Sequence, residues 1–250
     1  MADEVQETFL SHLIELRGRL IRCLFAFLVG CAPALYFSSE LYDLLAMPLI
    51  RSLPQGSHMI ATGVITPFLI PMKIAFMAAF IGALPFILYQ AWAFVAPGLY
   101  AHEKRLVLPL VLTSFILFLT GMAFCYFIVF GRVFAFIATF APKSISVAPD
   151  IEAYFNFVLG MFLAFGLAFE VPVVVVVLVI AGIVNVEQLR AWRGYVVVVI
   201  FIVAAIVTPP DVVSQVALAL PMCLLYEAGI FVGQFVTRRK AEAMAQGAPD

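Results

Sequence analysis

The feature that most constrains this chain is a series of six long apolar segments separated by short polar stretches. These segments lie near residues 20–37, 68–97, 106–135, 152–182, 194–208 and 212–236. A helix needs about 20 apolar residues to cross a bilayer, and these runs are too evenly apolar for barrel strands, whose residues alternate. The sequence therefore predicts an all-α polytopic membrane protein with six transmembrane helices.

The composition excludes a soluble domain. Of the 250 residues, 65% are hydrophobic and only 12% are charged, whereas a soluble domain is about half apolar and about a quarter charged. The four cysteines lie inside apolar segments without metal-type spacing. We therefore interpret them as small buried hydrophobic residues rather than as metal ligands or disulfide partners.

Prolines predict that the spans are bent. Prolines recur within the apolar segments, at Pro33, Pro71, Pro85, Pro109, Pro172 and Pro221. Proline removes a backbone hydrogen bond and tends to kink its helix, so we expect bent helices around a concave, cup-like space. The fifth segment is short, and the Thr208-Pro-Pro-Asp211 turn that follows it predicts a hairpin with a short first arm.

Basic residues indicate the orientation. Ten lie on the side of the termini: Arg17, Arg19, Arg22, Lys104, Arg105, Arg190, Arg193, Arg238, Arg239 and Lys240. The opposite side carries four, namely Arg51, Lys73, Arg132 and Lys143. Because basic residues accumulate on the cytoplasmic side, both termini are predicted to be cytoplasmic.

Two peripheral segments belong with the spans to one membrane domain at residues 1–237, and a short tail follows this domain. Residues 1–19 are predicted to form a cytoplasmic amphipathic helix, because Phe9, Leu13 and Leu16 recur at helical spacing. Residues 38–67 form an outer loop with a short helix in SSELYDLLAMPL. Residues 238–250 are expected to be a disordered cytoplasmic tail.

Glu170 is a lone carboxylate in the apolar run FLAFGLAFEVPVVVVVLVI. Acids within membrane spans are costly and rarely face lipid. Two interpretations remain open: a site that faces a cavity, groove or partner helix, and a structural hydrogen bond to a neighbouring helix.

Two further acids, Glu15 and Glu103, are predicted on the cytoplasmic side. Each has a simpler alternative: Glu15 lies four residues before Arg19 and can form a surface ion pair with it, and Glu103 can be a solvated acid after a helix end. Carboxylates bind guanidinium groups in a bidentate geometry that lysine does not reproduce. Together the two acids would suit a ligand rich in arginine.

The hairpin carries polar residues that suit helix association. Thr208 and Gln215 flank the Pro-Pro turn, and such side chains hydrogen-bond partner helices inside membranes. No nucleophile–base pair, phosphate loop or metal cluster is apparent, so we expect neither an enzyme nor a cofactor, and no nucleic-acid partner.

Several stretches of the chain form a recognisable set. They are HLIELRGRL at 12–20, Trp92 through Glu103, AFGLAFEVP at 164–172, TPPD at 208–211, LYE at 225–227, and AMPL and LPQGS at 46–49 and 53–57. Together they resemble the TatC family of twin-arginine translocase subunits. The resemblance extends over roughly residues 9–237, with the stretches in family order and spacing.

The resemblance implies a six-span, cup-shaped receptor in the bacterial inner membrane. Such a receptor binds the twin-arginine signal peptides of folded proteins, self-associates, lies in membrane lipid and works with the single-span subunits TatA and TatB. Transport is driven by the protonmotive force.

The resemblance also implies roles for individual residues. Phe94 and Glu103 would form the main arginine site, assisted by Glu15, Leu16 and Arg17. The other implied roles are partner docking at Ala205, Thr208 and Gln215, support of an outer cap by Pro48, and a concave-face position for Glu170.

Two rival classes make different predictions. A proton-coupled secondary transporter with Glu170 as its proton site would need an internal repeat, which the sequence lacks. A purely structural scaffold would bind arginine and lysine peptides equally.

Overall fold

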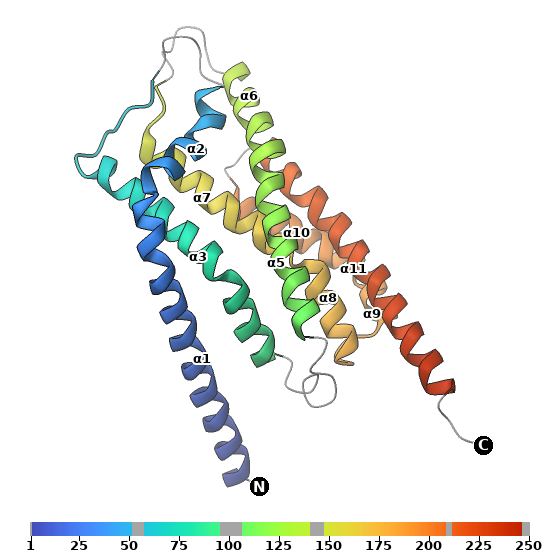
Figure 1. Ribbon diagram of the computed structural model, residues 1–250. Helices are drawn as coiled ribbons and strands as arrows, with labels where there is room; N and C mark the ends of the chain where they lie inside the picture. The colour runs from blue at the N-terminus through green and yellow to red at the C-terminus, as the bar shows by residue number, and fades with distance from the viewer. Residues whose placement is uncertain (1, 52–57, 96–106, 141–147, 209–211, 247–250) are drawn as a thin grey trace. The chain divides into compact units, whose positions relative to one another are not determined.

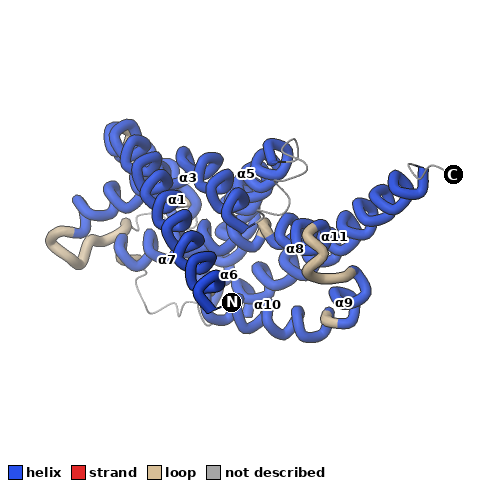
Figure 2. Tube along the Cα trace, turned by 90° about the horizontal axis from the view of Figure 1, so that it is seen from below, coloured by secondary structure: helices blue, strands red, loops and turns tan. Residues whose placement is uncertain are grey.

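The computed structural model describes residues 2–51, 58–95, 107–140, 148–208 and 212–246. These residues are helical apart from short connections and one isolated parallel bridge between Ile60 and Asp150 (Figure 2). The sequence predicts one membrane domain at residues 1–237. In the structure, Met1–Leu45 with Gly63–Phe115 forms one compact unit, and Ala46–Thr62 with Ile116–Asp250 forms a second.

Five helical stretches are long and apolar enough to cross a membrane. They are Leu13–Tyr36, Thr66–Phe94, Leu108–Phe136, Ile151–Ile180 and Val212–Arg238, and a shorter apolar helix covers Arg193–Ile206. Each corresponds to one predicted segment, and the short helix is the predicted fifth one. The all-α polytopic class and the six apolar segments are therefore confirmed.

The first unit is built on α1 (Ala2–Tyr36) and α3 (Thr66–Val95), which pack side by side (Figure 1). Gly30 allows this approach, because a Cβ at its position would lie 3.2 Å from the backbone oxygen of Ala79. The predicted amphipathic segment and the first span form one continuous helix. The predicted outer helix is also present, as α2 (Ser38–Ile50).

The third span is irregular in a way that proline does not explain. Helix α5 (Val107–Phe124) gives way to a π-helical turn, η2 (Cys125–Val129), before α6 (Phe130–Phe140). A π turn inserts one extra residue into the helical register. Pro109, which was expected to bend this span, lies instead in the first turn of α5, where proline is tolerated.

The fourth span consists of α7 (Ile151–Ala168) and α8 (Val171–Ile180), separated at Phe169 and Glu170. Pro172 lies in the first turn of α8 and lacks the N–H that a continuous helix would use. By contrast, α1, α3 and α11 continue through Pro33, Pro71, Pro85 and Pro221. Among these, only Pro172 accompanies an actual break.

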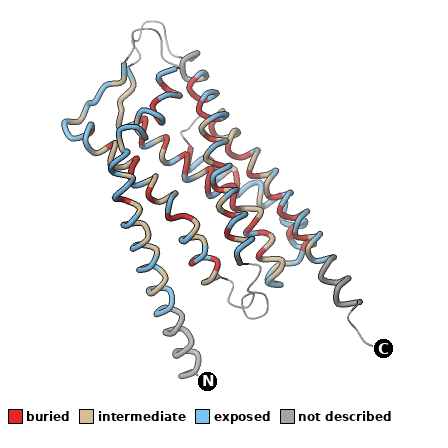
Figure 3. The backbone as a smooth tube through the Cα atoms, viewed as in Figure 1, coloured by how far each residue is buried: buried red, intermediate tan, exposed pale blue. Residues whose placement is uncertain are grey.

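The second unit has its apolar core where α8 meets α9 (Val186–Ala191) and α11 (Val212–Gln246). Its buried members are Val175, Val186, Leu189, Tyr226 and Ile230. Figure 3 shows the contrast with α1, which is mostly exposed or half-buried along its described length. Helix α11 extends to Gln246, so residues 238–246 are helical. The expectation of a disordered tail is wrong for these residues.

Candidate functional site

One candidate site lies in the first unit, where the part of α1 at Glu15 and Arg19 contacts α3 near its end. Arg19 donates from Nε to Glu15 Oε1 at 3.0 Å, and its Nη2 contacts the same oxygen. Its Nη1 reaches the Gln90 side-chain oxygen at 3.3 Å and the Gln90 backbone oxygen at 3.4 Å. The ion-pair interpretation of Glu15 is therefore confirmed, and the guanidinium also links α1 to α3.

This link brings predicted site residues of two helices to the same end of the unit. Glu15 lies one turn before Arg19 on α1, and Phe94 lies one turn after Gln90 on α3. Side chains four residues apart share a helix face. Phe94 is half-buried, whereas Leu16 and Arg17 are exposed on α1.

The last turn of α3 is held by a second contact. The buried indole Nε1 of Trp92 donates to Ser114 Oγ of α5 at 3.0 Å. Trp92 entered the sequence-based prediction only as the start of the stretch that ends at Glu103, and this bond was not predicted. The predicted partner acid, Glu103, lies outside the described residues.

Glu170 occupies the break between α7 and α8. Its N–H bonds to the Leu167 carbonyl at 3.1 Å, and its own carbonyl accepts from Val174 N–H at 3.0 Å. The residue is 8% exposed, and its side chain does not cap the first turn of α8. The break therefore places a buried acidic residue directly before the first turn of α8.

Two of the residues predicted to dock partners, Thr208 and Gln215, form hydrogen bonds within the short hairpin. α10 (Arg193–Val207) ends at Thr208, whose buried hydroxyl donates to the Ala204 carbonyl at 2.8 Å. Gln215 Nε2 on α11 donates to the Phe201 carbonyl at 3.2 Å. Ala205 is exposed on α10. Thr208 and Gln215 thus already use donors within the hairpin.

The opposite end of the hairpin is held by polar contacts that the sequence analysis missed. Arg193 at the start of α10 pairs with Glu227 of α11, and Arg190 Nη2 donates to Gln234 Oε1 at 2.8 Å. The buried Tyr226 hydroxyl donates to the Leu189 carbonyl at 2.9 Å. Glu227 is thus half of an exposed ion pair.

The outer loop is tied to the start of α7. Asp150 caps α7 by accepting from Ala153 N–H at 3.1 Å, and Oδ1 accepts from Thr62 N–H at 3.1 Å and from its hydroxyl at 2.8 Å. The N–H of Ala153, followed by the two Thr62 donors, holds the pKa of Asp150 below its ordinary value. Pro48, the predicted support of an outer cap, lies within α2.

Asp150 could have been found from sequence, because an aspartate directly before an apolar helical run is a helix-start signal. Its partner Thr62 has no such local signal, since the two residues are far apart along the chain. Within the described parts of the chain, no group of three or more His, Cys, Asp or Glu side chains could hold a metal ion.

Comparison with known proteins identifies the family. A family model described as "TatC: Sec-independent protein translocase protein (TatC)" matches residues 11–221. The chain belongs to the TatC family. It is 49% identical to the Escherichia coli K12 Sec-independent protein translocase protein TatC, over 94% of this chain and 91% of that protein. Identity to the Halothiobacillus neapolitanus protein of the same name is also 49%, over 100% of this chain and 71% of that protein.

Solved structures agree with this assignment. A crystal structure described as the twin arginine translocase receptor TatC covers 90% of this chain with a TM-score of 0.79 and 42% identity, and 99% of that chain is matched. A second, described as the same receptor in DDM, gives a TM-score of 0.80. The chain is therefore a protein translocase component with several membrane-spanning helices, placed in the inner membrane as TatC proteins are.

Proposed function

We propose that this TatC family member is the receptor for twin-arginine signal peptides, which it binds on the cytoplasmic side through Glu15 and Phe94 together with Glu103. The observation that carries the proposal is the Glu15–Arg19 pair, in which Oε1 of this carboxylate already accepts from two nitrogens of a guanidinium group. The Arg19–Gln90 contact supports a shared site, because it joins the helices that carry Glu15 and Phe94.

Arginine rather than lysine is the expected ligand. A guanidinium can offer two parallel donors to one carboxylate, whereas an ammonium group acts as a compact point charge. Two carboxylates, Glu15 and Glu103, match two neighbouring arginines in charge. Half-buried Phe94 offers a ring face to a guanidinium plane or an apolar surface to the residues that follow it. Exposed Leu16 and Arg17 assist as neighbours of Glu15 on α1.

Peptide binding tests this proposal directly. Purified full-length protein in nanodiscs is titrated with a labelled signal peptide carrying Arg-Arg and with its Lys-Lys counterpart. We expect a strong preference for Arg-Arg that is lost in Glu103→Ala and reduced in Glu15→Gln. Equal binding of both peptides would favour the scaffold hypothesis and reject the receptor proposal.

Export in cells provides a second test of Glu103. Glu103→Ala or Glu103→Gln is expected to abolish export of a twin-arginine substrate while the protein remains inserted in the membrane. The matched control is Glu187→Gln, because Glu187 lies exposed on α9 in the second unit. Unchanged export in the Glu103 variants would remove this residue from the proposed site.

We further propose that the hairpin of α10 and α11 docks the single-span subunits TatA and TatB, and that copies of the chain associate in the receptor complex. The outward face of α10 is apolar and exposed at Val199, Ile202 and Ile206, and Ala205 lies on the same helix. At 15 residues, α10 is about 22 Å long, short of the ~30 Å hydrocarbon core. A partner helix beside it would cover the apolar face where the bilayer must thin.

Glu170 is proposed as a polar position for partner assembly on the concave face, with transport driven by the protonmotive force. Its support is its placement at a helix break with 8% exposure, since intramembrane acids are retained where they serve a site. Glu170→Ala should weaken crosslinking to the partner subunits more than crosslinking to the signal peptide. The opposite order would place Glu170 in peptide binding, and loss of proton-coupled transport with intact assembly would favour the rival transporter hypothesis.

A further inference from the structure

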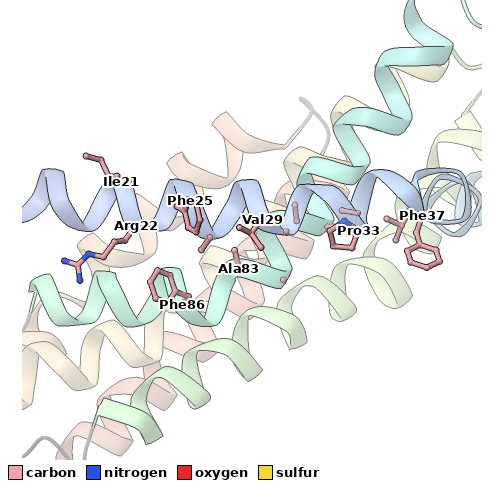
Figure 4. Close-up of a pocket in the computed structure, with 15 residues that line it drawn as sticks. Ile21, Arg22, Phe25, Val29, Pro33, Phe37, Ala83 and Phe86 are labelled. Atoms are coloured by element: carbon pink, nitrogen blue, oxygen red, sulfur yellow. The ribbon is translucent and has the colours of Figure 1, made fainter.

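The first unit carries a long groove that the proposed receptor function does not use. It has a volume of about 1100 Å³ and runs between α1 and α3, with Leu41 of α2 also in its lining. This exceeds the ~300–1,000 Å³ of ordinary small-molecule sites. Figure 4 shows Arg22 at one end, Phe37 at the other, and Phe25, Val29 and Phe86 between them.

The groove is a built feature of the helix pair. Small residues on both helices form its surface, namely Ala26, Gly30 and Ala34 of α1 and Ala78, Ala79, Gly82 and Ala83 of α3. Gly30 brings the helices into contact, whereas a Cβ at Gly82 would meet nothing within 4 Å. Larger side chains also line the groove, among them Phe25 and Val29, which are mostly exposed. Inside a membrane an apolar depression of this kind fills with chains that contact its surface, since an empty void forfeits those contacts.

Charge at one end of the groove selects among possible occupants. Apart from Arg22, every side chain in the lining is apolar. Arg22 Nε donates to the Gly18 carbonyl at 3.1 Å, a neutral acceptor that does not offset the positive charge. The bond uses only Nε, and the two terminal amino groups carry the donors with which a guanidinium binds phosphate. Neighbouring Arg19 is different, because its donors are committed to Glu15 and Gln90.

We propose that this groove is a binding site for an anionic phospholipid, with an acyl chain along α1 and α3 and its phosphate held by Arg22. The basic end is the cytoplasmic end, where anionic lipids attract basic residues near the surface. A phospholipid supplies an apolar chain and a negative headgroup in one molecule, which matches the lining in both respects. An apolar partner helix in the same place would cover the groove and leave the Arg22 charge without an anion.

Tryptophan quenching by brominated lipids tests the site. Phe86→Trp places a reporter in the groove near Arg22, and the signal of the two native tryptophans is subtracted with the unmodified protein. The full chain is reconstituted in phosphatidylcholine vesicles containing a minor fraction of either brominated phosphatidylglycerol or brominated phosphatidylcholine. We expect phosphatidylglycerol to quench with about fivefold higher apparent affinity, the increment of one basic residue near the membrane surface.

Two substitutions separate the headgroup contact from the acyl contact. Arg22→Gln should equalise the two lipids, and Arg22→Lys should retain part of the preference. Gly82→Leu should fill the groove and reduce quenching by both lipids. Gly160→Leu is the matched control, because a Cβ at this α7 glycine also meets nothing within 4 Å, and it should leave quenching unchanged.

Other results would overturn the proposal. Equal quenching by the two lipids before any change at Arg22 would mean that bulk lipid fills the groove without selection. A preference that survives Arg22→Gln would remove Arg22 from the site. Quenching abolished by an added single-span helix peptide, at equal lipid content, would assign the groove to a protein partner. Peptide-binding assays with the Arg-Arg signal sequence are independent of these readouts, so this inference and the receptor proposal fail separately.

Discussion

Arg19 directs both Nε and Nη2 to one oxygen of Glu15, Oε1, from one helical turn away on α1. The carboxylate proposed to receive a signal-peptide arginine therefore already holds an arginine of the same chain. An incoming guanidinium has to share or displace Arg19, and the Arg19 charge also repels it. The internal pair would thus set the binding affinity as well as the link between α1 and α3.

Arg19→Gln should raise the affinity for an Arg-Arg signal peptide. A partly exposed ion pair is worth up to about 1 kcal/mol, so its removal should tighten binding about two- to fivefold. Glu15→Gln should weaken binding instead. Fluorescence titration of the same peptide into both purified variants checks that the two changes in affinity have opposite signs. If Arg19→Gln loses as much binding as Glu15→Gln, Arg19 positions the site rather than competes for it.

The approach of α5 to α7 in the second unit depends on two glycines, Gly121 of α5 and Gly166 of α7. A Cβ at Gly121 would lie 2.4 Å from the backbone oxygen of Phe165, and one at Gly166 would lie 2.4 Å from the Phe118 ring. Gly121→Ala should be the more damaging change, because a backbone oxygen cannot move aside as a ring can. We expect a loss of about 1–3 kcal/mol in unfolding free energy, the usual cost of overpacking.

Unfolding by sodium dodecyl sulfate in mixed micelles, followed by tryptophan fluorescence, measures that loss. Gly131→Ala on α6 is the control, because a Cβ there meets nothing within 4 Å. The control should be neutral or stabilising by up to about 1 kcal/mol, since alanine favours helix more than glycine does. Equal effects of Gly121→Ala and Gly131→Ala would contradict the close helix contact.

Much of this fold is predictable from sequence because the membrane imposes it. Lipid requires long apolar helices, so the six segments and the short α10 follow from hydropathy alone. The π turn at Cys125–Val129 does not, since CYFIV resembles any other apolar helical stretch. Proline gave a mixed signal: Pro172 accompanies a break, but α11 continues through Pro221, because neighbouring groups in a membrane protein can satisfy the freed carbonyl.

The candidate site was predictable in residue type more than in geometry. The spacing of Glu15 and Arg19 indicated their ion pair, because helix periodicity places residues four apart on one face. The Arg19–Gln90 bond joins residues on different helices, and no local pattern specifies which helices pack together. The same reason hides the partner of Trp92. Long-range contacts of this kind require the tertiary structure.

Asp150 should make the stability of the outer loop depend on pH. Its pKa is lowered in the folded protein, first by the Ala153 N–H and then by the Thr62 hydroxyl and N–H. A carboxylate with a depressed folded pKa stabilises the fold above its unfolded pKa of about 3.9, and this contribution disappears as the pH falls through the folded pKa. Stability should therefore be unchanged from neutral pH down to about 5 and should decrease below about 4.

The melting temperature of the detergent-solubilised protein, compared with that of Asp150→Ala across this pH range, tests the Asp150 linkage. The difference between the two proteins should be largest near neutral pH and should shrink toward the acid end. Thr62→Val removes only the hydroxyl donor and should give a smaller difference with the same pH trend. A difference between wild type and Asp150→Ala that is constant with pH would show that the side chain acts only through packing.

Adjacent residues of α11, Tyr226 and Glu227, should differ in energetic weight. Tyr226→Phe removes the donor to the buried Leu189 carbonyl and should cost about 1–3 kcal/mol, because a buried acceptor is left without its bond. Glu227→Gln disrupts an ion pair with Arg193 whose side chains are 47% and 49% exposed, so it should cost no more than about 1 kcal/mol. Unfolding in mixed micelles at low and at high salt separates the two contributions. Only the effect of Glu227→Gln should shrink with salt, since screening acts on exposed charges. A larger loss of unfolding free energy in Glu227→Gln than in Tyr226→Phe would mean that the ion pair, rather than the buried tyrosine bond, holds α9 and α10 against α11.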